Sequence, residues 1–243
     1  MTLSRIYVEH DLAVGATIDL TRDRAHYVHR VLRLGSGDRV NVFNERDGEF
    51  GALLDEVRGA RASVVIGAAI RTQAESPLHT CLVQGLCRSQ RMDYCVQKAS
   101  ELGVNRIVPI RSERCVVRLD ERRAQKRLAH WQAVAISACE QSGRTRTPTI
   151  ELPIGFDQLL TREDIPGPAL LDPEHGARFA NWQFEGDALS LLVGPEGGFT
   201  DGEIASLVDF GAARWRMGPR VLRTETAGVV ALALAQSRWG DLG

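Results

Sequence analysis

The N-terminal part of the chain alternates short apolar segments with polar turns, and this pattern predicts β-structure. Three segments rich in Val and Ile are separated by glycine-containing breaks, namely residues 5–8, 39–43 and 62–66. From residue 25 to residue 34 the apolar positions recur at helical spacing, and the glycine-containing tetrapeptide 35–38 ends that helix. Many short strands with a single helix are typical of a small β-barrel.

A second pattern begins after residues 72–77, a polar segment ending in proline that we interpret as a linker. Beyond it, apolar strands alternate with helices that carry an apolar face. The predicted strands are residues 80–86, 106–110, 169–171 and 189–193, and the predicted helices are residues 92–102, 121–141, 200–210 and 225–238. This alternation predicts an α/β domain with a largely parallel sheet, so we divide the chain into residues 1–72 and 73–243.

The composition fits globular domains in a reducing compartment. The chain has 243 residues, of which 44% are hydrophobic and 25% charged, close to the globular average. The longest small-apolar run, residues 227–235, is too short to span a bilayer, and no apolar signal segment opens the sequence. Five cysteines without a C-x-x-C pair, and histidines without metal-ligand spacing, argue against a disulfide framework and against a metal site. We therefore expect a cytoplasmic protein without a metal or a membrane partner.

The charge is balanced overall, with a net value of −1, but it is unevenly distributed. Residues 86–148 carry 13 basic and 6 acidic side chains, whereas residues 149–210 carry 2 basic and 12 acidic ones. Nearly all the basic residues are arginine, which suits bidentate contacts to phosphate. The basic block is either one wall of a nucleic-acid site or a solvated helix face in a protein from a GC-rich genome.

Residues 192–200 are the strongest candidate for a ligand-binding turn. An apolar strand runs through a turn of glycine and proline into a helix capped by Thr200 and Glu203. Ligands of open α/β sheets lie beyond the carboxyl ends of the strands, and glycine lets the backbone approach a ligand closely. The turn matches neither the dinucleotide-binding G-x-G-x-x-G pattern nor a P-loop. The alternative is an ordinary tight turn.

Residues 217–227 form a second such turn, with two arginines and a glutamate at the start of an apolar helix. The alternative here is a capped loop with an exposed ion pair, which adds little stability. Two further polar motifs, residues 112–115 and 140–144, are either functional or plain surface.

Taken together, five motifs in this order resemble those of the RsmE family, bacterial enzymes that methylate N3 of a uridine in small-subunit (16S) ribosomal RNA. They are residues 97–104, 112–115, 140–144, 194–198 and 222–227, and residues 5–8 and 29–33 also fit. The resemblance covers nearly the whole chain. It implies a PUA-like β-barrel over residues 1–72 and a SPOUT domain with a trefoil knot over residues 73–243. It also implies S-adenosylmethionine (SAM) as methyl donor, a homodimer, and 16S ribosomal RNA in the small ribosomal subunit as partner.

By the same resemblance, three loops of the SPOUT domain hold SAM, namely residues 171–174, 194–198 and 217–227. The implied cofactor-binding residues are Leu171, Gly194, Pro195, Glu196, Gly197, Gly198, Met217, Gly218, Leu222, Arg223, Thr226 and Ala227. Backbone groups of such loops can bind adenine and ribose, while Leu171, Met217 and Leu222 supply apolar walls. Because SAM has no phosphate, no phosphate-binding pattern is needed.

The reaction requires loss of the N3 proton of uracil, so positioning and electrostatics should dominate. We expect Arg223 or Arg114 to stabilise the charge on a uracil oxygen, and Glu225 or Glu196 to act as the base. Glu225 has the alternative role of a favourable charge at a helix N-terminus. N3 lies on the Watson–Crick edge, so the target base must be unpaired or extruded.

The expected contacts to the RNA backbone come from five arginines and predict salt-sensitive binding. They are Arg5, Arg30, Arg33, Arg88 and Arg91. Three rival functions remain open at this point: methylation of another RNA target such as transfer RNA, non-catalytic RNA binding, and a small-molecule reaction. The last leaves the barrel and the basic block unexplained.

Overall fold

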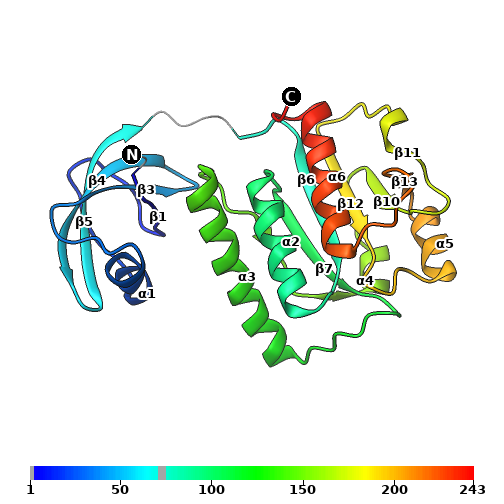
Figure 1. Cartoon of the computed structure of the whole chain (residues 1–243), viewed down its shortest axis with the longest axis horizontal. Helices are drawn as coiled ribbons and strands as arrows, with labels where there is room; N and C mark the ends of the chain where they lie inside the picture. The colour runs from blue at the N-terminus through cyan, green and yellow to red at the C-terminus, as the bar shows by residue number, and fades with distance from the viewer. Residues whose placement is uncertain (1–2, 71–74) are drawn as a thin grey trace. The chain divides into compact units, whose positions relative to one another are not determined.

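The computed structural model describes residues 3–70 and 75–243, which form two compact units (Figure 1). The first unit comprises the described part of Met1–Glu75 together with Cys139–Thr147, and the second comprises Ser76–Ala138 and Pro148–Gly243. The division predicted between residues 72 and 73, and much of the predicted linker, lie outside the described residues.

The first unit is built on a five-stranded sheet in the order β1-β3-β4-β5-β2. Its strands are β1 (Arg5–Tyr7), β2 (Thr17–Asp19), β3 (Arg39–Asn44), β4 (Gly48–Arg58) and β5 (Arg61–Ile70). Strands β3, β4 and β5 pair antiparallel, and Gly59, with φ +60°, supplies the left-handed residue that the short β4–β5 turn requires. Helix α1 (Arg22–His26) and the π-helical turn η1 (Tyr27–Val31) add the single helical stretch that the periodicity predicts.

The motif at residues 140–144 lies inside this first unit, bound to Arg5. The Arg5 guanidinium donates to the carbonyls of Cys139 at 2.5 Å and Arg144 at 2.9 Å, and it pairs with Glu49 at 2.9 Å. Glu140 accepts hydrogen bonds from the backbone N–H of Tyr7 and from the guanidinium of Arg24. Burial raises the pKa of Glu140 although Arg24, the Tyr7 N–H and Arg5 all oppose the rise. The motif therefore has a structural role, because it joins separate segments of the first unit.

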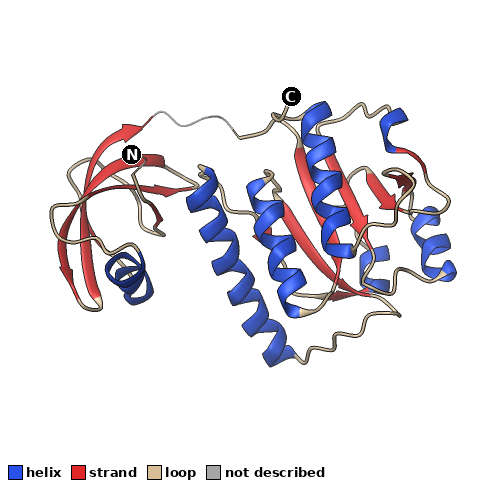
Figure 2. Cartoon of the chain, viewed as in Figure 1, coloured by secondary structure: helices blue, strands red, loops and turns tan. Residues whose placement is uncertain are grey.

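The second unit is an α/β domain with a parallel sheet in the order β11-β13-β10-β12-β6-β7-β8 (Figure 2). Its strands are β6 (His79–Gly85), β7 (Arg106–Arg111), β8 (Thr149–Ile150), β9 (Ile154–Gly155), β10 (Pro168–Leu171), β11 (Ala177–Arg178), β12 (Ala188–Val193) and β13 (Ala213–Arg216). Strand β9 pairs with β7. This arrangement confirms the predicted α/β fold with a parallel sheet.

Helices cover both faces of this sheet (Figure 1). They are α2 (Ser89–Glu101), α3 (Glu121–Ser142), α4 (Phe156–Leu160), α5 (Asp201–Asp209) and α6 (Thr224–Trp239), and η2 (Phe179–Asn181) is a short 3-10 turn. Apolar residues of α2, α3 and α6 share one core cluster, whereas α4 and α5 share another with the opposite strand faces. Among the described residues, no helix combines the length and apolarity that crossing a membrane requires.

We expect Arg5→Ala to destabilise the first unit by about 3–5 kcal/mol, because the substitution leaves Glu49 buried without its cation. Arg46→Ala is the matched control, since Arg46 pairs with Asp11 on the surface and such pairs contribute about 0–1 kcal/mol. All four tryptophans lie in the second unit, so the measurement is hydrogen exchange of β3 to β5 rather than fluorescence. Equal effects of the two substitutions would contradict a structural role for Arg5.

Candidate functional site

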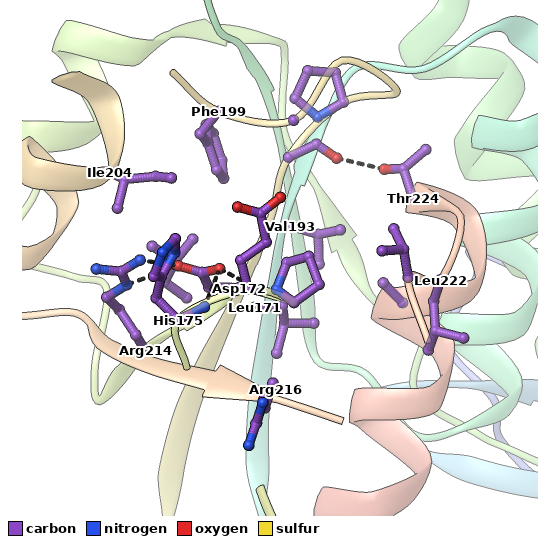
Figure 3. Close-up of a pocket in the computed structure, with 18 of the residues that line it drawn as sticks. Leu171, Asp172, His175, Val193, Phe199, Ile204, Arg214, Arg216, Leu222 and Thr224 are labelled. Carbon is purple, nitrogen blue, oxygen red and sulfur yellow. Dashed lines mark hydrogen bonds and ion pairs between the residues drawn. The ribbon is translucent and has the colours of Figure 1, made fainter. Parts of the chain in front are cut away.

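A cavity of about 1210 Å³ opens at the carboxyl ends of three neighbouring strands, β10, β12 and β13 (Figure 3). Its walls are the segments that follow these strands, together with α5 and the first turn of α6. The two glycine-containing turns predicted from the sequence meet here, because parallel strands deliver their carboxyl ends to the same edge of the sheet.

The loop after β10 is held by Asp172, whose side chain is 5% exposed. Its Oδ1 accepts the backbone N–H groups of Glu174 at 2.9 Å and His175 at 3.1 Å, and its Oδ2 accepts Arg214 Nε at 2.8 Å (Figure 3). Burial acts to raise the pKa of Asp172, but the Arg214 guanidinium and the two backbone N–H groups outweigh it and lower the pKa. Asp172 is thus ionised at neutral pH and fixes this wall to β13.

The central loop is joined to the start of α6 by the Thr224 hydroxyl. Thr224 Oγ1 donates to the carbonyl of Gly194 at 2.5 Å (Figure 3). The same oxygen accepts a hydrogen bond from Gln84 Nε2 at 2.8 Å. Gln84 lies on β6 and is fully buried, so this chain of hydrogen bonds runs through the apolar core. A Cβ on Gly85 would come within 2.3 Å of Pro195 N, so glycine is required there for the loop to approach β6.

Glu196 faces the N-terminus of α2. Its Oε1 accepts the backbone N–H of Arg88 and the Nη1 of Arg91, both at 3.1 Å. Arg88 itself provides no side-chain cap for α2, so Glu196 supplies the negative charge that a helix N-terminus favours. Arg91 also lies 3.6 Å from Glu225 and is therefore paired with both of the carboxylates predicted as bases.

Arg114 lies against the other side of the central loop. Its Nη1 donates to the carbonyls of Gly197 at 3.3 Å and Phe199 at 3.2 Å. These two hydrogen bonds hold Arg114, one of the two residues predicted to stabilise the uracil oxygen, in a fixed orientation at the cavity wall.

Most of the cofactor-binding residues predicted from the sequence line the cavity. These are Leu171, Gly194, Pro195, Glu196, Gly197, Gly198, Met217, Leu222, Arg223 and Ala227, and Arg114 joins them. Gly218, Glu225 and Thr226 are not part of the lining. Along α6, Thr224 and Ala227 are three residues apart and face the cavity together, while the two residues between them point elsewhere around the helix.

The arginines predicted to bind RNA are in different environments. Arg5 is buried in the first unit with its donors engaged, which favours a structural role over contact with phosphates. Arg30 and Arg33 are exposed in and just after η1, and Arg88 is exposed at the start of α2. Arg91 lines the cavity and is paired with carboxylates.

Sequence reasoning missed Gln84 and Arg214 as parts of the site, and it included Asp172 and Thr224 only as members of loops. Gln84 carries a readable signal, since it is a polar residue that directly follows the apolar run 81–83 of β6. Within the described ranges, no group of His, Cys, Asp and Glu has the arrangement of a metal site.

Comparison with known proteins identifies the family. The profile of the RNA methyltransferase domain matches residues 74–236, and that of the RNA methyltransferase PUA domain matches residues 20–57. The chain is 31% identical to the ribosomal RNA small subunit methyltransferase E of Buchnera aphidicola subsp. Schizaphis graminum, over 99% of this chain and 98% of that one. The chain belongs to the ribosomal RNA small subunit methyltransferase E family. The resemblance inferred from the five motifs is confirmed, and the first unit is PUA-like.

Solved structures of similar proteins agree with this family. A ribosomal RNA small subunit methyltransferase E from Neisseria gonorrhoeae, bound to S-adenosyl methionine, superposes with a TM-score of 0.93 and is 37% identical, covering 99% of this chain and 100% of that one. A Legionella pneumophila protein solved in complex with the bound cofactor SAM superposes with a TM-score of 0.96 and is 33% identical, with full coverage of both chains.

We expect Gly197→Val to abolish SAM binding while the fold is retained, because a Cβ at residue 197 would come within 2.9 Å of the Arg114 Cβ. The measurement is isothermal titration calorimetry with SAM, with circular dichroism as the check on folding. Gly202→Val is the control, since the space around a Cβ at residue 202 is open to 4.0 Å. An unchanged SAM affinity for Gly197→Val would remove the central loop from the cofactor site.

We expect Asp172→Asn to lower the free energy of unfolding of the second unit by about 1–3 kcal/mol near neutral pH. Since the folded pKa of Asp172 is depressed, its contribution is present above the ordinary value of 3.8 and is lost as the pH falls further. The difference between the wild-type protein and the variant should therefore shrink between pH 5 and lower pH. Urea unfolding followed by tryptophan fluorescence measures it, and a difference independent of pH would contradict the role of the charge.

Proposed function

We propose that this protein transfers the methyl group of SAM to N3 of a uridine in 16S ribosomal RNA of the small ribosomal subunit. The observation that carries the proposal is the cavity at the ends of β10, β12 and β13, formed by the loops that contain the family motifs. Membership of the family and the SAM-bound relatives support the same reaction.

The residues of the cavity fit SAM. Its volume of about 1210 Å³ exceeds what one such cofactor needs and leaves room for a base beside it. Leu171, Met217 and Leu222 offer apolar walls for adenine, and the central loop offers backbone groups for the polar parts. When bound, SAM supplies a methyl group on a positively charged sulfur, which is the electrophile of the reaction.

The protein must take the N3 proton and oppose the charge that then develops on the uracil oxygens. Both predicted carboxylates pair with Arg91, but Glu196 is the better base because it lines the cavity whereas Glu225 lies outside the lining. The N3–H bond breaks as the proton passes to the Glu196 carboxylate. The electron pair left on N3 would then form the new bond to the methyl carbon, while the bond from that carbon to sulfur breaks and its electron pair stays on the sulfur.

Arg114 is the better group to stabilise the uracil oxygen, because two backbone carbonyls hold its guanidinium at the cavity wall. A charge that is oriented before the reaction needs no reorganisation as the anion forms. Arg223 also lines the cavity and is exposed, so it is the second candidate for this role.

RNA is recognised in part by the PUA-like first unit, with Arg30 and Arg33 as exposed contacts to the backbone. Arg88 at the start of α2 adds a further exposed charge. The uracil edge that carries N3 is hidden in a base pair, so the target must enter the cavity as an unpaired or extruded nucleotide.

The proposal includes a homodimer in the cytoplasm and a trefoil knot in the SPOUT-type second unit. Helix α6 supports the dimer, because residues 227–235 at its centre are all small or apolar and Leu234 remains 38% exposed. Val229, Val230 and Ala233 on the same helix are only partly buried. A second copy of the chain is a natural cover for such a helix.

The test is methyl transfer from labelled SAM to small subunits that lack their normal methylations, with the nucleosides identified by mass spectrometry. The expected product is 3-methyluridine. Transfer to another nucleotide or to another RNA would contradict the proposed target, and the absence of both transfer and SAM binding would contradict the enzyme.

We expect Glu196→Gln to lower kcat by about 10²–10⁴-fold with little change in SAM affinity, because glutamine keeps an acceptor for the Arg88 N–H but cannot take the proton. The loss should diminish at higher pH, where more of the uracil is already deprotonated. Glu225→Gln should have a smaller effect with the pH profile of the wild-type protein. Identical profiles for the wild-type protein and Glu196→Gln would exclude Glu196 as the base.

A further inference from the structure

The cavity holds more arginine than SAM can use. Six arginines line it, whereas SAM carries two cationic groups and a single carboxylate. Three of the six are already engaged within the protein: Arg91 with Glu196, Arg214 with Asp172, and Arg114 with backbone carbonyls. The other three are Arg216, Arg220 and Arg223.

Two of these, Arg216 and Arg220, have no acidic residue close to them in the sequence. Between Ala213 and Arg223 the sequence contains four arginines and no Asp or Glu. Within residues 3–70 and 75–243, Arg214 is the member of this segment that forms an ion pair, and Arg216 and Arg220 form none. Figure 3 has Arg216 near the end of β13, away from the Asp172–Arg214 pair.

A fourth arginine from a separate strand extends the group. Strand β11 runs parallel to β13, with Arg178 as the Cα partner of Arg216. Arg178 and Arg220 are exposed, and Arg216 is half-buried. Like charges on paired positions of a sheet repel each other, so the arrangement costs stability unless an anion lies across it.

We propose that Arg178, Arg216 and Arg220, here called the arginine strip, bind the backbone phosphates of the RNA strand next to the target uridine. Guanidinium groups suit phosphate because they donate two parallel hydrogen bonds to it. The strip adjoins Met217 and Leu222 at the proposed cofactor wall, so it binds the RNA strand close to the reacting base. The inference rests on the proposed function and adds a second RNA contact, outside the PUA-like unit.

The experiment compares Arg178→Gln, Arg216→Gln, Arg220→Gln and the triple variant with the wild-type protein. KM for small subunits, kcat, and binding to labelled 16S ribosomal RNA are measured over a range of salt concentrations. Each single variant should raise KM for RNA about fivefold, the size of one charge-assisted contact. Each should also reduce the slope of log affinity against log salt by about 0.7. SAM affinity by calorimetry and kcat should stay unchanged in Arg178→Gln, because Arg178 lies outside the cavity lining.

Two controls separate a specific contact from general charge. Arg220→Lys keeps the charge and should retain the wild-type salt slope. Arg123→Gln removes an exposed arginine of α3 that lies outside the cavity lining, and it should leave the slope unchanged.

A wild-type salt slope in the triple variant would overturn the inference, as would an equal loss of slope in Arg123→Gln. Weakened SAM binding in Arg178→Gln would overturn it too, because this arginine would then serve the cofactor. Since RNA binding is measured apart from transfer, these outcomes decide the inference even if the wild-type protein methylates no small subunit, which would defeat the proposed function alone.

Discussion

The hydroxyl of Thr224 is the interaction on which the geometry of the site depends. It joins the carbonyl of Gly194, at the end of β12, to the first turn of α6. Gln84 on β6 donates a hydrogen bond to the same hydroxyl oxygen. Because the side chains of Gln84 and Thr224 are buried, leaving either of them without its partner carries the full cost of desolvation. Two walls of the cavity are thereby fixed to each other, and the Asp172–Arg214 pair fixes the third to β13. The loops are preorganised by contacts that need no ligand.

The arginines around the cavity fall into two groups. Some are paired with groups of the protein itself, and others are available to bind ligands. Arg91 and Arg214 each pair with a carboxylate that shapes a wall, and Arg114 is oriented by two carbonyls. Arg216 and Arg220 stand on a segment without acidic residues. This division is what a methyltransferase acting on RNA requires, because its cofactor is a cation and its substrate is a polyanion.

Periodicity predicted the long elements well, since α3 and α6 begin and end within a residue or two of the expected bounds. Strands β8, β9 and β11 have two residues each and are too short for any periodic signal. The two glycine-containing turns were readable as parts of a site, but not which of their side chains face the cavity. Thr226 illustrates this, because Thr224 and Ala227 in the same first turn of α6 face the cavity whereas Thr226 does not. The structural role of Arg5 could not be predicted either, since its partner Glu49 is 44 positions away in the sequence and its acceptor carbonyls lie beyond residue 138.

We propose that the three segments following β10, β12 and β13 together form one SAM site. Hydrogen exchange of the protein with and without SAM tests it most directly, because exchange reports each segment separately. We expect SAM to slow hydrogen exchange in residues 171–176, 193–199 and 216–224 together, and to leave the exchange rates of the strands of the first unit unchanged. Protection confined to one of the three segments, or found elsewhere in the chain, would contradict it.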